Sequence, residues 1–463
     1  MSIKTHTFPN GFRIIYETPE NHMNITHVNV FCRVGSAFEP ENVRGVSHFI
    51  EHMCFKGTPT LPTARDILVE YDTIGAYFNA YTEKQYTCYV AKFHSNYTKH
   101  SLEILADILL HSSFNKTEYE KEMNVVIEEN VRNETDYDGE ADDLVESMVY
   151  KGSVYENPVD TLQYHKAVDV WKYDDVIAFY RKNYVPQNML LSIVTTIPFD
   201  KIIQYVKNTH FAKHDSRKTI IDPILNTVPR MLYDKQYGVQ VEIKSIKDIQ
   251  TTYLVVAFRT CSLYSDDRYA LNVLRAILGA TFTSRMFTIL REKNGLTYTS
   301  HVETVYYEHS GDIRFSAITD SKKLLYNRKP QTRKRTATTS RFASRNVKKG
   351  VLPLIMDMIR DLIKHGVTEK ELSETKRYLE GKQMLNMENA ETQVDYNGKE
   401  LFLHNTPHID PYKTLYQKHI QPITREDIHR VIIKYFTPEN MNVAIVGGGL
   451  GSTLAIRKAC EIL

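Results

Sequence analysis

The sequence predicts an α+β protein made of two similar, duplicated halves, in each of which helices pack on a mostly antiparallel sheet. Each half mixes short strand-like runs with long segments of helical periodicity. One segment also recurs: an aromatic residue, then Pro-x-Asn-Met, then a β-branched strand, at residues 184–194 and again at 435–446. The offset between Asn188 and Asn440 is 252 residues.

A second repeat has nearly the same offset, 253 residues. Residues 114–118 (Phe-Asn-Lys-Thr-Glu) match residues 367–371 (Val-Thr-Glu-Lys-Glu). Each member follows an amphipathic segment with apolar residues at helical spacing, 102–111 in the first case and 352–365 in the second. Because two independent places have nearly the same offset, the sequence indicates a duplication.

The predicted halves span residues 1–208 and 241–463, and residues 209–240 are the predicted linker. The second half contains a basic insertion, residues 321–350, rich in Lys, Arg, Thr and Ser, for which we expect an exposed, disordered loop. This insertion holds eleven Lys and Arg and no acid, so the rest of the chain has 47 basic and 56 acidic residues, a net charge of −9. The total of +2 therefore excludes a generally basic nucleic-acid binder but conceals one basic segment.

Individual elements follow from local signals. The Asn-Gly turn at 10–11 leads into a strand at Phe12–Glu17. Ser47 is a plausible cap for the helix that follows it. Residues 118–134 lack Gly and Pro and predict a helix. The segment after Met189 predicts a strand, and the segment around Leu271–Gly279 predicts a helix of the second half.

The cysteines and the N-terminal segment indicate the compartment. There are five cysteines, and no two have a Cys-x-x-Cys spacing, which argues against a disulfide framework and against a cysteine-based zinc site. The N-terminal segment resembles neither a secretory signal nor an Arg-rich transit peptide. No run approaches 18 consecutive apolar residues, so no membrane-spanning helix is expected. We expect buried thiols and a cytoplasmic location, with mitochondrial import by an internal signal left open.

The motif that carries chemistry is His-Phe-Ile-Glu-His at residues 48–52. On a helix, His48 and His52 project from one face, where two imidazoles can bind one zinc ion. Glu51 lies beside that face and is placed to take the proton of an attacking water. This is the HxxEH pattern, the inverse of HExxH. Two surface histidines beside a surface glutamate are the alternative interpretation of the pattern by itself.

A catalytic zinc site needs a third protein ligand and an open position. The candidates lie on the predicted helix at 118–134, which contains the neighbours Glu128 and Glu129. They face directions about 100° apart, so helical periodicity does not choose between them. Glu122 shares a face with Glu129, seven residues further on.

Several blocks together resemble the pitrilysin and insulin-degrading enzyme family of zinc metallopeptidases, and the length is closest to its mitochondrial processing peptidase branch. The resemblance covers nearly the whole chain apart from 321–350. The blocks that carry it are Arg44–Thr58 (zinc-binding helix), Gly75–Thr82 (substrate-pairing strand), Val125–Glu129 (third-ligand helix) and Leu290–Tyr298 (second-half active-site block).

The resemblance implies which glutamate is the third ligand. In that family the metal-binding Glu follows the second His by about 77 residues, and a supporting Glu precedes it by seven. Glu129 and Glu122 satisfy both conditions, whereas Glu128 would put Lys121 in the supporting position. The resemblance therefore implies Zn²⁺ bound by His48, His52 and Glu129, with Glu122 orienting the site.

Further roles are also implied by the resemblance. Arg291 and Tyr298 match second-half residues that reach the substrate, and the Tyr hydroxyl would donate to the oxyanion. Asn79 and Ala80 match positions that hold substrate backbone by strand addition. The second half lacks a zinc set of its own: Lys382 stands 253 residues beyond Glu129. One zinc ion per chain is therefore expected, with the second half a non-catalytic wall of a clam-shell chamber.

The expected function is zinc-dependent metalloendopeptidase activity on peptides or unfolded segments. At about half the length of the long family members, the chain is expected to form a homo- or heterodimer. The alternative is a catalytically inert structural or partner subunit of the same family, although such subunits usually lose the HxxEH residues. The run at 328–335 (Arg-Lys-Pro-Gln-Thr-Arg-Lys-Arg) has three interpretations, of which a solvated loop without a role ranks first. A nuclear-localisation or nucleic-acid patch ranks second, and a surface that attracts acidic substrates or a partner ranks third.

Overall fold

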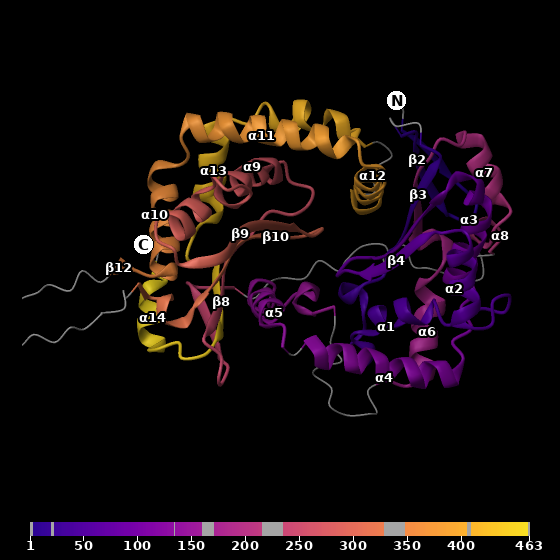
Figure 1. Ribbon diagram of the computed structural model, residues 1–463, viewed down its shortest axis with the longest axis horizontal. Helices are drawn as coiled ribbons and strands as arrows, with labels where there is room; N and C mark the ends of the chain where they lie inside the picture. The colour runs from indigo at the N-terminus through magenta and orange to yellow at the C-terminus, as the bar shows by residue number, and fades with distance from the viewer. Residues whose placement is uncertain are drawn as a thin grey trace, which may run out of the picture. The chain divides into compact units, whose positions relative to one another are not determined.

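The computed structural model describes residues 3–19, 23–133, 135–159, 171–214, 235–327, 348–404 and 409–461. The chain divides into two compact units, each assembled from three segments (Figure 1). Unit 1 consists of Met1–Thr135, Gly152–Leu232 and Leu379–Lys418; unit 2 consists of Asp136–Lys151, Tyr233–Tyr378 and His419–Leu463.

Unit 1 contains a six-stranded sheet in the order β1-β2-β6-β3-β5-β4 among its described residues. Only β2 and β6 are parallel neighbours, and the other adjacent strands pair antiparallel. Strand β4 therefore forms one edge of the sheet. The strands are β1 (Lys4–Thr7), β2 (Arg13–Glu17), β3 (Ile25–Cys32), β4 (Tyr77–Thr82), β5 (Thr87–His94) and β6 (Met189–Val194).

Unit 2 repeats this sheet topology. Its described strands follow the order β7-β13-β8-β10-β9, which reproduces β2-β6-β3-β5-β4, including the single parallel pair, here β7 and β13. The prediction of two similar sheet-and-helix halves is therefore confirmed. The strands are β7 (Gln240–Ser245), β8 (Thr251–Thr260), β9 (Thr297–Tyr306), β10 (Gly311–Asp320) and β13 (Met441–Gly447), with a short separate pair β11 (Tyr326–Asn327) and β12 (Lys348–Lys349).

The helices follow the same duplicated order. In each half, four helices of the described residues precede the final strand: α3 to α6 lie between β5 and β6, and α10 to α13 lie between β12 and β13. The helices of the first half are α1 (Val46–Met53), α2 (Ala64–Thr73), α3 (Thr98–Leu110), α4 (Lys116–Asn133), α5 (Tyr137–Val149), α6 (Tyr173–Asn183), α7 (Phe199–Lys207) and α8 (His210–Lys213). Those of the second are α9 (Asp267–Gly279), α10 (Val351–His365), α11 (Glu369–Met387), α12 (Ala390–His404), α13 (Arg425–Tyr435) and α14 (Thr453–Ala459).

The repeated Pro-x-Asn-Met motif has the same structural role twice. The side-chain amide of Asn188 donates to the Asn183 carbonyl at the end of α6, 3.0 Å away, and that of Asn440 donates to the Tyr435 carbonyl at the end of α13, 3.1 Å away. The Asn188 carbonyl accepts from the backbone amide of Arg33, just after β3, at 2.9 Å. The Asn440 carbonyl accepts from the backbone amide of Arg259, within β8, at 3.0 Å. The motif thus joins the end of a helix to the next strand in each half.

Each half of the sequence supplies one helix to the other unit. Helix α5 packs on β13 and β8 in unit 2, and α12 packs on β6 and β3 in unit 1 (Figure 1). Gly398 of α12 permits this approach, because a Cβ there would lie 2.1 Å from the ring of Phe31. The boundaries 1–208 and 241–463 describe the repeat in the sequence and stay a prediction, as does a chamber between the halves.

Other expectations concern smaller features. The strand expected at Phe12–Glu17 is β2, and the five cysteines are buried and free. Most of the predicted linker (215–234) and of the basic insertion (328–347) lies outside the described residues. In the part of the chain that is described, no helix combines the length and apolar character needed to cross a bilayer.

Candidate metal centre

Helix α1 presents the two histidines because its other side is anchored in the core. Phe49, Ile50 and Met53 are fully buried in the main apolar cluster of unit 1. With those three side chains turned into the core, His48 and His52, four residues apart, share the other face. The core therefore holds both imidazoles in register.

The prediction that Ser47 caps α1 is wrong. Ser47 lies inside the helix, which begins at Val46 after Gly45 in a left-handed conformation (φ 85°). The carboxylate of Glu39 takes the capping role, accepting from the backbone amides of Gly45 at 2.6 Å and Ser47 at 2.8 Å. A negative charge at a helix N-terminus is favourable, and two of its free amides are satisfied. Burial nonetheless raises the pKa of Glu39 to about 7, against these hydrogen bonds.

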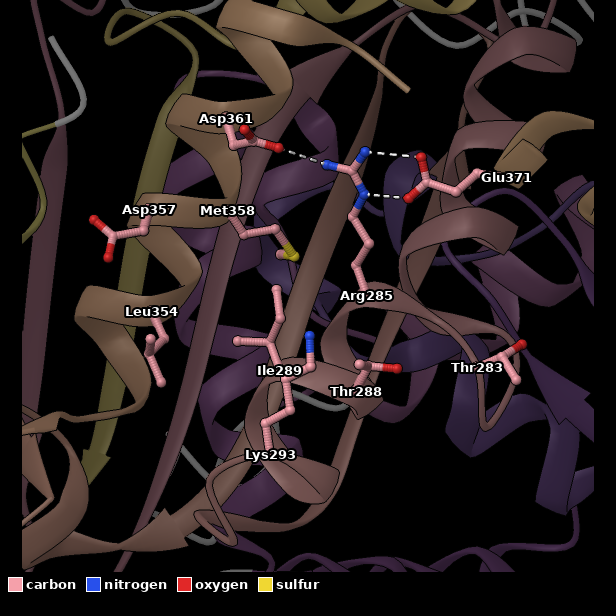
Figure 2. A pocket seen from close by; sticks show the side chains of 10 residues that line it. All are labelled: Thr283, Arg285, Thr288, Ile289, Lys293, Leu354, Asp357, Met358, Asp361 and Glu371. Atoms are coloured by element: carbon pink, nitrogen blue, oxygen red, sulfur yellow. Dashed lines mark hydrogen bonds and ion pairs between the residues drawn. The ribbon is translucent and has the colours of Figure 1, made fainter. Parts of the chain in front are cut away.

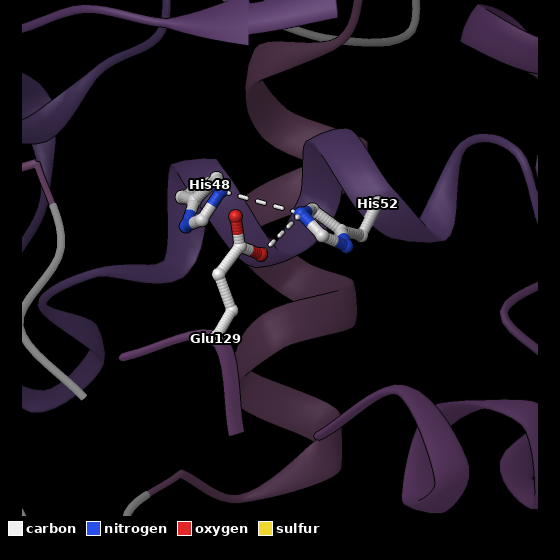
Figure 3. Close-up of side chains that lie close together, drawn as sticks. All are labelled: His48, His52 and Glu129. Atoms are coloured by element: carbon white, nitrogen blue, oxygen red, sulfur yellow. Dashed lines mark hydrogen bonds and ion pairs between the residues drawn. The ribbon is translucent and has the colours of Figure 1, made fainter. Parts of the chain in front are cut away.

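The HxxEH histidines meet a glutamate from α4, as Figure 3 shows. The Nε2 atoms of His48 and His52 are 3.2 Å apart, and His52 Nε2 lies 3.6 Å from Glu129 Oε2. A tetrahedral zinc ion with bonds of 2.0–2.1 Å places its ligand atoms about 3.3–3.4 Å apart. The three donors thus have the chemistry and nearly the spacing of a zinc site. Glu128, the other candidate, is exposed.

Glu122 supports this centre from the same helix. Its Oε1 lies 2.9 Å from His52 Nδ1, and its Oε2 lies 2.6 Å from the Lys56 ammonium. A carboxylate on Nδ1 keeps the proton there and leaves the Nε2 lone pair directed at the donors, as is usual for metal-binding histidines. Although burial opposes it, the contacts with His52 and Lys56 lower the pKa of Glu122, so the carboxylate stays charged.

The two histidines differ electrostatically. Burial, with the charge of His52, lowers the pKa of His48 to about 4, so its imidazole is neutral and able to bind a metal at physiological pH. Burial also disfavours charge on His52, but the hydrogen bond to Glu122 and the nearby carboxylates outweigh it and raise the pKa of His52. A metal ion at this centre would therefore compete with a proton for His52 Nε2.

Glu51 is buried beside the centre, with 8% of its surface exposed. Thr82, the last residue of β4, donates its hydroxyl to Glu51 Oε2 at 2.6 Å. Burial raises the pKa of Glu51, partly offset by the hydrogen bond from Thr82 and by His52. The carboxylate is thus oriented by one hydrogen bond and is more basic than an exposed glutamate.

Asn79 and Ala80 lie on the edge strand β4, opposite Val90 and Tyr89 of β5. The amide of Ala80 donates to the side chain of Asn79 at 3.0 Å. A peptide added to this edge would therefore compete with Asn79 Oδ1 for that donor.

Arg291 and Tyr298 belong to unit 2. Arg291 lies on the π-helical turn η9 (Phe287–Glu292), and its guanidinium donates to the Tyr298 carbonyl at 3.0 Å. The Tyr298 side chain, at the start of β9, is 88% exposed. The Arg291 guanidinium thus contacts the backbone of Tyr298, and the phenol is open to solvent within its unit.

Three residues around the centre escaped the sequence analysis. Lys56 lies in the block 44–58 but carried no role, and it follows the end of α1 at Met53, so helical spacing does not place it. Thr82 ends the quoted block 75–82 but carried no role. Glu39 left no local signal, because the loop that precedes α1 brings it to the helix.

Comparison with known proteins shows the family to which the chain belongs. The profile described as "Insulinase (Peptidase family M16)" matches residues 15–161, and that described as "Peptidase M16 inactive domain" matches residues 171–379. A Rickettsia bellii protein named as an uncharacterized zinc protease is 31% identical over 317 residues, covering 68% of this chain and 73% of its own. A Bacillus subtilis protein named as the uncharacterized zinc protease YmxG is 27% identical over 401 residues, covering 87% of this chain and 88% of its own.

Solved structures share the fold. A protease from Helicobacter pylori superposes with a TM-score of 0.82 at 20% identity, covering 96% of this chain and 99% of that one. The first half of the periplasmic protease PqqL from Escherichia coli gives a TM-score of 0.74 at 16% identity, covering 99% and 95%. The class is thus that of chains built from two duplicated sheet-and-helix units. The chain belongs to peptidase family M16, the insulinase family.

Proposed function

We propose that this protein is a zinc-dependent metalloendopeptidase that hydrolyses peptides or unfolded segments. One observation carries the proposal: two imidazoles and a carboxylate meet at nearly the spacing of a tetrahedral zinc site, with a second, buried carboxylate beside them. Family membership and the zinc proteases among the relatives support it.

His48, His52 and Glu129 would hold one Zn²⁺ per chain. When bound, zinc would lower the pKa of water and polarise the scissile carbonyl. Glu51 would take a proton from the attacking water and return it to the leaving amine, a role that suits a carboxylate whose pKa is raised by burial. Glu122 is a positioning residue that holds the ring of His52.

Substrate would bind as an added strand along β4, at Asn79 and Ala80. Strand addition uses main-chain hydrogen bonds, so it favours extended peptides over folded proteins. Arg291 and Tyr298 would contact the substrate from the second half, the Tyr hydroxyl donating to the oxyanion.

We also propose that the protein acts as a homo- or heterodimer in the cytoplasm. The basic segment 321–350 has no part in the reaction, and neither a membrane nor a nucleic acid is needed.

The test compares the wild type with Glu51→Gln on a quenched peptide library, with zinc measured by metal analysis. We expect both proteins to bind zinc and only the wild type to cleave. Removing a general base typically costs 10²- to 10⁴-fold in rate. Glu128→Gln is the matched control: it changes a neighbouring glutamate that faces solvent and should leave zinc binding and cleavage intact. If the wild type bound no zinc and cleaved nothing, the proposal would be wrong.

A second candidate is the inert partner subunit. It is favoured by the match of residues 171–379 to a domain described as inactive. In the part of the second half that is described, α9 has no histidine pair, and Lys382 on α11 stands where the repeat would put a ligand. Zinc binding without cleavage by the wild type, alone or with a partner, would favour this candidate.

A further inference from the structure

A second cluster of metal-binding side chains lies in unit 1, apart from the HxxEH centre. It consists of Asp107, His111 and His210. Asp107 and His111 are four residues apart at the C-terminal end of α3, and His210 begins α8, about a hundred residues further along the chain. The cluster is therefore a product of tertiary packing.

The distances in this cluster fit a metal ion. Asp107 Oδ1 lies 3.5 Å from His111 Nδ1 and 3.8 Å from His210 Nε2, and the ring centroids of the two histidines are 3.7 Å apart. The spacing between ligands of a tetrahedral zinc ion is about 3.3–3.4 Å. Both separations are too long for good hydrogen bonds and only slightly longer than this spacing.

Asp107 provides a second, independent observation. Its side chain is 7% exposed, and Oδ1 is buried with no hydrogen-bond partner among the described residues. The other oxygen, Oδ2, accepts from the hydroxyls of Thr58, at 2.5 Å, and Thr60. A buried carboxylate oxygen without a donor costs free energy, whereas a cation between it and the two imidazoles would compensate it. Hydrogen bonds on the other oxygen are the usual support of a ligating carboxylate.

The position of His210 is set by its neighbour. Phe211 is fully buried and stacks on Phe12 with ring centroids 4.4 Å apart. The side chain of Asn10 donates to the Phe211 carbonyl at 2.8 Å. These contacts hold α8 against unit 1 before any metal binds. A site that is ordered in advance loses less entropy on binding.

The duplicated half provides an internal comparison. Helix α10, the counterpart of α3, also ends with an Asp and a His four residues apart, Asp361 and His365, whose Oδ1 and Nδ1 atoms are 2.9 Å apart. There Asp361 Oδ2 is paired with the Arg285 guanidinium at 3.1 Å, as Figure 2 shows, and Asp361 is 54% exposed. An arginine pairs with the carboxylate in that half, whereas no Lys or Arg among the described residues pairs with Asp107.

We propose that Asp107, His111 and His210 bind a second divalent transition-metal ion, with zinc the first candidate, which ties α8 to the end of α3. Two imidazole nitrogens and one carboxylate oxygen are a donor set for zinc and similar first-row ions, and unsuited to Ca²⁺ or Mg²⁺. His111 and His210 are 35% and 40% exposed, so the remaining coordination position is open to water. The site does not depend on the proposed peptidase activity.

The experiment counts zinc ions bound by the full-length chain. Metal-free wild type, His48→Gln, His210→Gln and the double variant are titrated with Zn²⁺ in competition with a chromogenic chelator. We expect two ions for the wild type, one for each single variant and none for the double. In His210→Gln, the zinc affinity of the second site should fall by more than roughly 10- to 100-fold, which is the loss typical of removing a residue that only supports a metal ligand.

His365→Gln is the matched control, because it makes the same substitution in another Asp–His pair four residues apart, at the end of α10, and it should bind two ions. Because His210 is partly exposed, its replacement should preserve the fold, which circular dichroism checks; His111→Gln repeats the test from α3. A zinc-dependent rise in melting temperature should persist in His48→Gln and vanish in the double variant.

The outcomes separate the two sites. If one ion binds and is lost in His48→Gln but not in His210→Gln, the second site does not exist and the cluster is an ion-pair network. If one ion binds and is lost only in His210→Gln, the second site stands and the peptidase centre fails.

Discussion

Replacing Glu122 by Gln tests how strongly the residues behind the metal centre control it. Glu122 touches no proposed substrate position, and its two oxygens contact His52 Nδ1 at 2.9 Å and the Lys56 ammonium at 2.6 Å. A hydrogen bond to a charged group contributes about 1.5–3 kcal/mol. At about 1.4 kcal/mol per tenfold change, its weakening should reduce zinc affinity by about 10- to 100-fold. The same range is typical for removal of a carboxylate behind a metal-binding histidine.

The assay is zinc titration of the metal-free protein, followed by peptide cleavage at limiting and saturating zinc. Because Glu122 positions a ligand, cleavage by Glu122→Gln should be poor at limiting zinc and should recover largely at saturation. A merely destabilised protein would not recover. Glu118→Gln is the matched control, since it lies on the same helix and pairs with Lys121 at 2.7 Å away from the centre. Unchanged zinc affinity in a folded Glu122→Gln protein would refute this reasoning.

Three further predictions concern stability and the insertion. Although burial opposes it, the ion pair with Arg285 lowers the pKa of Glu371 to about 2. Because this is below the ordinary 4.5, its stabilisation is present above pH 4.5 and disappears as the pH falls toward 2. Glu371→Gln should cost about 2 kcal/mol at pH 7 in denaturant unfolding, and a cost unchanged at pH 2 would contradict this. Gly398→Ala drives a methyl group into the ring of Phe31 and should destabilise the protein by about 1–3 kcal/mol. Gly381→Ala is the control, because open space surrounds that position. Equal melting temperatures for the two variants would count against the packing argument. Replacing 328–347 by Asn-Gly, across the strand pair that brackets it, should preserve zinc binding and cleavage, and loss of either would show that the insertion is integral.

The sequence predicted those features that depend on short-range geometry. His48 and His52 share a face because four residues make about one helical turn, and the five-residue pattern therefore specified its own geometry. The duplication was also readable, because Asn188 and Asn440 make the same hydrogen bond at the same point of each half. Buried cysteines and the strand at Phe12–Glu17 followed from composition and alternation.

Features that depend on how helices rotate and dock could not be read in this way. Periodicity left Glu128 and Glu129 equivalent, and the packing of α4 on α1 turns the second toward the histidines and the first toward solvent. The cap of α1 was misassigned, because Glu39 reaches the helix from a preceding loop while Ser47 lies within it.

Long-range docking decided the rest. Helices α5 and α12 each pack on the sheet formed by the other half of the sequence, and they therefore belong to units 2 and 1. The cluster at Asp107 exists only because burial of Phe211 brings His210 to the end of α3. The sequence by itself indicated which residues one helix presents and the two-fold plan of the chain, because the first is encoded within one helical turn and the second in a repeat of nearly constant offset. The tertiary structure alone decided which distant carboxylates and imidazoles meet. The burial of apolar side chains sets the rotation and docking of each helix, and this burial does not depend on the polar groups that the helix carries.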